Sequence, residues 1–157
     1  MTSPRDRRAA RVLLVDGADR VLLLRGTDPA DPSQGEWWFT PGGGLDEGEQ
    51  PVQAACRELA EETGLVLDEA DLGPVVHERV AHFRFSGQHY RQAEVFYLAR
   101  VDRHEVDTAG WTPLEVASVL EHRWWPRTEL AVTTERVYPD DLAAVLTRAL
   151  LTRAQAR

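Results

Sequence analysis

The stretch from Gly43 to Leu65 constrains this chain more than any other part of its sequence. It reads GGLDEGEQPVQAACRELAEETGL and fits the pattern G-x5-E-x7-R-E-U-x-E-E-x-G-U, in which U is a bulky aliphatic residue. The pattern is filled by Gly43, Glu49, Arg57, Glu58, Leu59, Glu61, Glu62, Gly64 and Leu65. If each strict identity occurred at the frequency of glycine, about 7%, the joint chance per starting position would be on the order of 10^-8. Coincidence is therefore no serious explanation of the match.

Three carboxylates of this stretch are spaced for one face of a helix. Glu58, Glu61 and Glu62 stand at i, i+3 and i+4, and side chains at this spacing are neighbours on a helix surface. Like charges so placed destabilise an isolated helix, whereas Mg2+ prefers oxygen ligands and is held by carboxylates, waters and substrate phosphates. A solvated acidic face is the alternative reading, which the surrounding pattern disfavours. The cluster is therefore predicted to hold a divalent cation.

The residues on either side of the carboxylates predict how they are held. Residues 41–44 read PGGG, a run in which backbone can adopt positive φ and approach a ligand closely, so the Gly42 carbonyl is free to reach a metal. Pro51 suits the first turn of a helix, and Gly64 suits the left-handed position after its end. A helix from Pro51 to about Thr63 is therefore predicted, with a buried stripe formed by Val52, Ala55 and Leu59.

Length and composition indicate a single domain over residues 1–157, with about the first ten residues flexible. Hydrophobic residues make up 43% and charged residues 28%, which is within the globular range. No apolar run is long enough for a transmembrane helix or a signal peptide, and one cysteine, Cys56, fits a reducing compartment, so a cytoplasmic location without membrane association is expected. The net charge of -8 disfavours binding to duplex nucleic acid.

Periodicity and turn residues predict an alternation of strands and helices. The predicted strands are residues 11–15, 21–24, 37–40, 75–85, 90–101 and 119–125, of which the first two and the 75–85 and 90–101 pair form hairpins. The predicted helices besides 51–63 are 126–131 and 139–151, with a helical turn near 113–116. Mixed strands that bracket two helices indicate an α/β fold in which helices cover both faces of a sheet.

The pattern from Gly43 to Leu65 resembles the Nudix box, the signature of the Nudix hydrolase superfamily. The resemblance implies an α/β/α sandwich with a mixed central sheet. It also implies a Mg2+-dependent enzyme, with Mn2+ as a possible substitute, that cleaves the diphosphate linkage of NDP-X to NMP and P-X, or acts on nucleoside triphosphates. The metal ligands would be Gly42, Glu58, Glu61 and Glu62. Glu58 and Glu61 would be the catalytic carboxylates, with Glu61 either ligating a metal or orienting the attacking water.

The resemblance also assigns structural roles within the box. Glu49 and Arg57 would form an ion pair that holds the loop to the helix, and Gly43 and Gly64 would complete the structural positions. Some similar enzymes recruit a further acid from a downstream loop, for which Glu115 and Glu121 are candidates and Glu94 a weaker one.

The substrate-binding residues are less constrained. Arg25 and Arg91 could contact phosphate, although an arginine at a strand end is more often a surface ion-pair partner. Trp38 could stack on a base, although one residue of a Trp37-Trp38 pair must point inward from a strand. A small nucleotide substrate is expected, and no second motif selects one.

Two other classes of function are compatible with the same fold. A non-catalytic module could sense a nucleotide or ADP-ribose, but such modules usually carry degenerate boxes, and this box is intact. An interaction scaffold with an acidic face would be indifferent to Mg2+. The oligomeric state is open, and a homodimer is one possibility.

Overall fold

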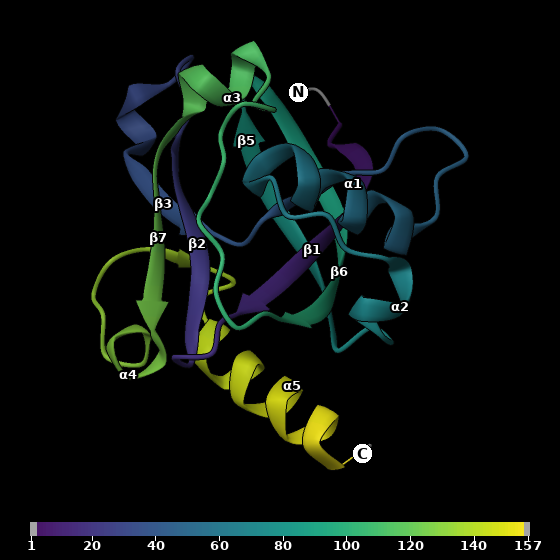
Figure 1. Cartoon of the computed structure of the whole chain (residues 1–157). Helices are drawn as coiled ribbons and strands as arrows, with labels where there is room; N and C mark the ends of the chain where they lie inside the picture. Colours follow the sequence, from purple (N-terminus) through teal and green to yellow (C-terminus); the bar gives the residue numbers. More distant parts are fainter. Residues whose placement is uncertain (1–2, 156–157) are drawn as a thin grey trace.

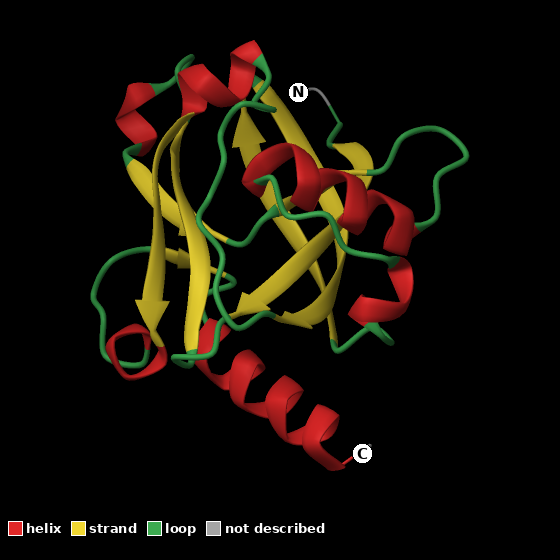
Figure 2. Ribbon diagram, in the orientation of Figure 1, coloured by secondary structure: helices red, strands yellow, loops and turns green. Residues whose placement is uncertain are grey.

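The computed structural model describes residues 3–155, which form a curled, mixed eight-stranded sheet with helices on both faces (Figures 1 and 2). The strand order is β5-β6-β1-β2-β3-β8, with β4 paired to β1 and β7 to β2. The pairs β1–β6 and β3–β8 are parallel and the others are antiparallel. The strands are β1 Arg5–Val15, β2 Arg20–Thr27, β3 Glu36–Phe39, β4 Gly42–Gly44, β5 His77–Phe85, β6 Gln88–Arg100, β7 Val119–Pro126 and β8 Val137–Tyr138.

The helices lie at the two faces and the ends of the sheet (Figure 1). They are α1 Pro51–Thr63, α2 Glu69–Leu72, α3 Pro113–Ser118, α4 Arg127–Leu130 and α5 Leu142–Gln155, with a 3-10 turn at Pro32–Gln34. None of these helices is both long and apolar enough to span a membrane.

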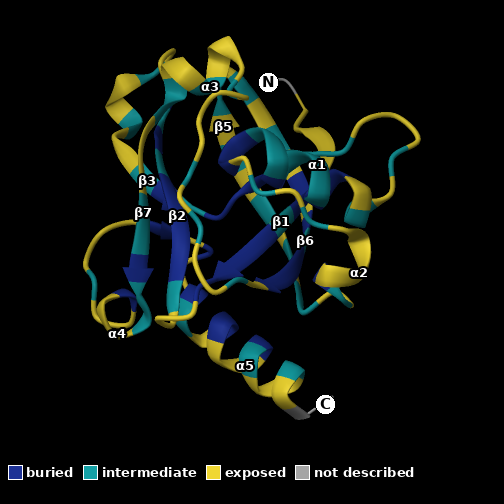
Figure 3. Ribbon diagram, in the orientation of Figure 1, coloured by how far each residue is buried: buried dark blue, intermediate teal, exposed yellow. Residues whose placement is uncertain are grey.

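Strand alternation divides the core into two layers, one on each face of the sheet. Successive side chains of a strand point to opposite faces, so Leu13 and Val15 of β1 pack with α5 while Val12 and Leu14 pack with α1. The central strands are the most deeply buried part of the fold (Figure 3). This arrangement confirms the predicted α/β/α sandwich with a mixed central sheet.

The first strand begins earlier in the structure than the sequence pattern predicts. Residues 5–10 belong to β1 and pair in parallel with β6, beginning with Arg5 opposite Tyr90, so β1 begins at Arg5 and not at the predicted Arg11. The reason is that the long strand β6 offers its whole edge to β1, and backbone pairing does not require apolar side chains. The expectation for residues 1 and 2 lies outside the described residues.

Candidate active site

The helix α1 positions the three box glutamates. Its start is fixed by Pro51 in the first turn and by the Gln53 side chain, which accepts a hydrogen bond from the Gln50 amide at 2.8 Å. Its end is fixed by Gly64, which has a left-handed φ of 76° and donates its N–H to the Ala60 carbonyl. The apolar side of the helix is buried against the sheet, and the glutamates lie beside that buried side. They are Glu58, Glu61 and Glu62.

The Gly-rich strand β4 brings backbone against these carboxylates. Gly42 has a φ of 144°, and a Cβ atom added there would lie 2.2 Å from the Ala10 carbonyl oxygen. The Gly42 amide donates to Glu62 Oε1 at 3.4 Å. A Cβ atom on Gly43 would lie 2.6 Å from Glu58 Oε1. Residues without side chains are therefore required here, because any larger residue would displace β1 or the Glu58 carboxylate.

Glu62 is the most unusual group of the cluster. Its side chain is 5% exposed, and its Oε2 atom is buried without a hydrogen-bond partner among the described residues. Burial, and then the nearby charge of Glu58, raise the pKa of Glu62 well above its ordinary value. Burial also raises the pKa of Glu58, although Arg57 opposes this shift. A buried carboxylate without a cationic partner is costly, so both groups suit a bound cation.

The arrangement fits Mg2+ better than a cation that needs a closed cage of side chains. Among the described residues, no three acidic, histidine or cysteine side chains converge as a complete ligand set. Mg2+ keeps several waters and uses substrate phosphates as ligands, so an open site formed by the Gly42 carbonyl, Glu58 and Glu62 is compatible with it. Glu61 is 39% exposed at its side chain, which leaves it available to a ligand or a water.

Arg57 joins the box loop to the cluster. Its Nε and Nη2 atoms each donate to one carboxylate oxygen of Glu49 at 2.8 Å, and Nη2 also donates to the Gly44 carbonyl at 3.0 Å. The hydrogen bond from Arg57 is the main cause that lowers the pKa of Glu49 to about 2. Arg57 Nη1 lies 3.0 Å from Glu58 and 3.5 Å from Glu61, so it also offsets the negative charge of the cluster.

Replacing Glu49 by glutamine is expected to destabilise the protein by about 2 kcal/mol near neutral pH, because a charge-assisted bidentate contact is lost. A lowered folded-state pKa contributes stability above the ordinary value of 4.5, and this stability is lost as pH falls toward about 2. The wild type should therefore lose stability more steeply than the variant between these pH values. Urea unfolding at several pH values measures both effects, and parallel curves would contradict the structural role of the pair.

A strap formed by residues 102–112 covers the C-terminal end of α1. Trp111 Nε1 donates to the Glu62 carbonyl at 2.7 Å, the Asp107 amide donates to the Thr63 carbonyl at 2.9 Å, and His104 Nε2 lies 2.7 Å from the same oxygen. These contacts satisfy carbonyls that a helix end leaves free. The sequence predicts no helix or strand in this segment and does not reveal its role, since no local pattern links it to the helix.

The strap leads directly into α3, which carries one predicted downstream acid. The charge of Glu115 contributes to the raised pKa of Glu62, so Glu115 is on the same side of the molecule as the cluster. Glu121 instead forms an ion pair with Arg25 at 2.9 Å. Glu115 has a structural contact as well, because its Oε1 accepts the Thr112 amide at 3.1 Å in the capping box of α3. Its effect on Glu62 is what favours it over Glu121 for a supporting role.

The predicted substrate residues have other contacts in the structure. Arg25 also pairs with Glu36 at 2.7 Å, and Arg91 pairs with Asp6 at 2.7 Å. Trp38 is 4% exposed and packs edge-on against another core tryptophan. Its ring is therefore not available to a base, which corrects the stacking prediction, because its register in β3 points it inward.

The sequence analysis did not single out two arginines of β1 that reach the cluster. Arg11 Nε donates to Glu94 at 3.1 Å and Nη1 donates to the Gly42 carbonyl at 3.2 Å. Burial would raise the pKa of Glu94, but Arg11 and Arg79 hold it below its ordinary value. Glu94, the weaker candidate acid, is therefore a partner of arginines. The Gly42 carbonyl retains its second lone pair for a metal.

Arg7 is the second of these arginines. It lies beside Gly44, where an added Cβ atom would be 2.8 Å from its Nε, and its guanidinium is 5.6 Å from the centre of the Tyr90 ring. Among the described residues it has no ion-pair partner, and the charge of Glu58 acts on it. The signal in the sequence is the i, i+4 spacing of Arg7 and Arg11, which places both on one face of a strand.

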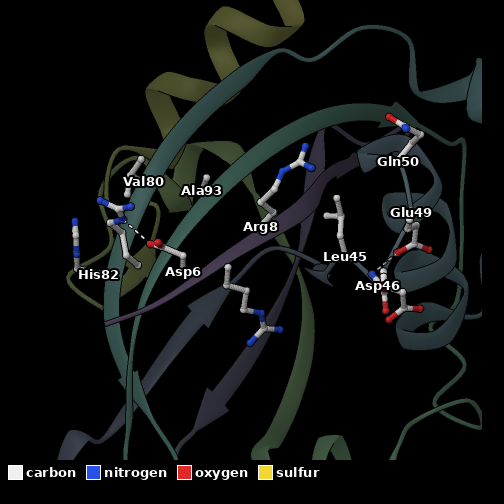
Figure 4. Close-up of a pocket in the computed structure, with 13 residues that line it drawn as sticks. Asp6, Arg8, Leu45, Asp46, Glu49, Gln50, Val80, His82 and Ala93 are labelled. Carbon is white, nitrogen blue, oxygen red and sulfur yellow. Dashed lines mark hydrogen bonds and ion pairs between the residues drawn. The ribbon is translucent and has the colours of Figure 1, made fainter. Parts of the chain in front are cut away.

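A groove adjoins the cluster on the side of Arg7, which is one of its lining residues. It has a volume of about 1030 Å³ and separates the box loop, residues 45–50, from the N-terminal part of β1 and the neighbouring strands (Figure 4). Arg8, His82 and Arg91 line one side, and Asp46 and Glu49 line the other. None of the three box carboxylates Glu58, Glu61 and Glu62 lines it, so the groove does not define the reaction centre.

Comparisons with known proteins agree with the fold and with the box. The family model described as NUDIX domain matches residues 5–146. An RNA pyrophosphohydrolase of Dinoroseobacter shibae is 31% identical over 73% of this chain and 80% of that protein. A MutT protein structure from Methanosarcina mazei superposes with a TM-score of 0.70 at 15% identity, over 98% of this chain and 99% of that one. A C. elegans Ap4A hydrolase superposes with a TM-score of 0.61 at 18% identity, over 95% and 98% of the two chains.

Proposed function

The chain belongs to the Nudix family, and from this premise we propose that it is a Mg2+-dependent hydrolase that cleaves the diphosphate linkage of a nucleotide with water. Its family and its named relatives make it a hydrolase of pyrophosphate bonds. The products of an NDP-X substrate would be NMP and P-X. The proposal assigns the chemistry to the box carboxylates and a bound cation.

One observation carries the metal dependence. Glu62 has a buried oxygen atom without a hydrogen-bond partner among the described residues, next to a second carboxylate whose pKa is also raised. Such an arrangement is unfavourable unless positive charge is added. When bound, Mg2+ would supply charge that stabilises the phosphate oxygens as the linkage breaks.

The chain's own groups supply the remaining requirements of the reaction. Glu58 and Glu62, with the Gly42 carbonyl, would hold the cation at the start of β4. Glu61 is half-exposed and lies within 3.5 Å of Arg57, a position from which its carboxylate can orient a water and accept its proton. Arg57 donates hydrogen bonds to the Glu49 carboxylate and the Gly44 carbonyl. These bonds hold the glutamate-bearing face of α1 next to the box loop and β4. Glu115 is the candidate for a supporting acid.

Arg7 is proposed to contact the substrate phosphates. It is a cation without an ion-pair partner among the described residues, and the charge of Glu58 acts on it. An arginine fork matches phosphate oxygens geometrically. Arg7→Gln is therefore expected to raise KM at least about tenfold, the equivalent of about 1.4 kcal/mol, with a smaller change in kcat. Steady-state kinetics measures the two separately, and an unchanged KM would remove Arg7 from the site.

The substrate class is proposed from the named relatives. The substrates named for an RNA pyrophosphohydrolase and an Ap4A hydrolase both contain a chain of phosphates attached to a nucleoside. The acidic surface of this chain, with a net charge of -8, favours small substrates or single RNA ends over duplex nucleic acid. A nucleotide with an accessible phosphoric anhydride is therefore the expected substrate.

The test is product release across a panel of substrates with Mg2+, with Mn2+ and with EDTA. The panel contains ADP-ribose, nucleotide sugars, nucleoside triphosphates, diadenosine tetraphosphate and a short RNA with a 5′-triphosphate. Cation-dependent turnover of any of these compounds supports the proposal and identifies the class. Binding that raises the melting temperature without turnover would instead indicate a sensor, and turnover that persists in EDTA would overturn the metal dependence.

A further inference from the structure

The strand β5 ends the sheet at one side, and part of its outer edge is open. It occupies the end of the strand order, and β6 is its only neighbour among the described strands. Its side chains alternate between half-buried and exposed along the whole strand (Figure 3). Open edges present unpaired backbone groups to other chains, so their coverage in solution needs an explanation.

The hairpin geometry shows which backbone groups of β5 point outward. Phe85 and Gln88 are paired across a two-residue turn, and such a closing pair exchanges both hydrogen bonds. The odd-numbered residues of β5 therefore bond to β6, and the even-numbered residues point away. Gln34 Nε2 confirms this assignment, because it donates from outside to the Arg84 carbonyl at 3.2 Å.

The outer edge is covered at one end and free at the other. Besides the contact to Arg84, the Ser86 amide bonds to Asp28 at 2.9 Å, so the loop before β3 covers this end. Among the described residues, the outward backbone groups of Glu78, Val80 and His82 have no partner. The Val80 side chain is 58% exposed.

We propose that a second copy of this chain docks on this free edge and pairs antiparallel about Val80. Val80 would face Val80 of the second copy, and Glu78 would face His82 of the second copy on both sides of the two-fold axis. Directly opposed residues of an antiparallel pair interact, and an imidazole N–H can donate to a carboxylate. The sequence of the strand is therefore complementary to itself in this register, as an isologous interface requires.

Val80→Pro tests the backbone part of the interface. The Val80 N–H points away from β6, so proline removes it without breaking the β5–β6 ladder, and edge positions tolerate proline. Because Val80 pairs with itself, both central hydrogen bonds of the dimer are lost. The dissociation constant is expected to rise at least about tenfold, the equivalent of about 1.4 kcal/mol, in sedimentation velocity over a wide range of protein concentrations.

A charge exchange tests the register independently of folding effects at Val80. Glu78→Lys and His82→Glu should each weaken the dimer, because each places like or unpaired groups opposite one another. The double variant Glu78→Lys/His82→Glu restores opposite charges and should recover dimerisation. Recovery is a result that general destabilisation of β5 would not produce.

The outcomes distinguish an edge of β5 that binds a second copy of the chain from an edge whose charged side chains prevent association. Wild-type protein that is monomeric at every concentration would overturn the proposal and show that the charges on β5 prevent association. A dimer that none of the variants weakens would place the interface elsewhere. Turnover per chain is expected to be unchanged in Glu78→Lys, since β6 and β1 separate β5 from β4 and Glu78 does not line the groove that contains Arg7. The dimer and the enzymatic proposal therefore fail independently.

Discussion

Replacing Glu62 by glutamine is expected to lower turnover at least about a hundredfold while the fold is preserved. Glutamine has nearly the same shape as glutamate but no charge, so it removes one anionic ligand from the cluster. Loss of one group that stabilises charge in the transition state typically costs about 10²–10³ in rate. The measurement is steady-state kinetics together with a circular dichroism spectrum.

A second measurement separates a lost ligand from a distorted helix. Cation binding to the folded state stabilises it by RT ln(1 + [L]/Kd), so Mg2+ should raise the melting temperature of the wild type more than that of Glu62→Gln. The matched control is Glu69→Gln, which removes the same charge from an exposed position on α2. Wild-type turnover in Glu62→Gln with an unchanged spectrum would exclude the proposed role of Glu62.

The elements that form within one continuous segment were predictable, because the residues that determine them are close together in the sequence. Pro51, Gly64 and the apolar stripe of α1 give the same helix bounds in the prediction and in the structure. The hairpin of β5 and β6 is likewise confirmed, because its turn and alternation lie in one continuous segment. The spacing of Glu58, Glu61 and Glu62 on one helix face follows from the same local geometry.

The remainder depends on contacts between distant segments. β8 contains only Val137 and Tyr138 and forms by parallel pairing with β3, which no local pattern encodes. Arg11 reaches Gly42 and Glu94, and Trp111 reaches Glu62, only because the sheet brings separate segments together. Residue patterns therefore predicted the carboxylates of the candidate site but not the cations and the strap around them.

Replacing Gly42 by alanine is expected to destabilise the protein by about 4 kcal/mol or more, at the high end for a single substitution. Gly42 has a φ of 144°, and the added Cβ atom would lie 2.2 Å from the Ala10 carbonyl oxygen and 2.7 Å from Arg11 Cα. Both neighbours are backbone atoms of the central strand β1, which cannot move without disrupting its pairing with β6. Since native domains are stable by only about 5–15 kcal/mol, much of the protein should be unfolded at moderate temperature.

Two other glycines of the same loop provide matched controls for this argument. Gly48 also has a positive φ, 76°, but an added Cβ atom meets nothing within 4 Å, so Gly48→Ala should cost only about 1–2 kcal/mol. At Gly43 the added atom meets the Glu58 carboxylate at 2.6 Å, and this flexible side chain can move aside. Gly43→Ala should therefore fold nearly normally, at a cost of about 1–2 kcal/mol, but lose at least about tenfold in turnover, because Glu58 is displaced.

Urea unfolding and steady-state kinetics on the three alanine variants separate the two functions of the loop. The expected order of unfolding free energies places Gly42→Ala far below the other two, whereas activity falls in Gly43→Ala and is retained in Gly48→Ala. Equal stability of Gly42→Ala and Gly48→Ala would show that β1 can yield at this position. Full activity of Gly43→Ala would show that the Glu58 carboxylate works from a position other than the one beneath β4. The loop thus combines a backbone requirement at Gly42 with a requirement for space at Gly43, and each can be removed without the other.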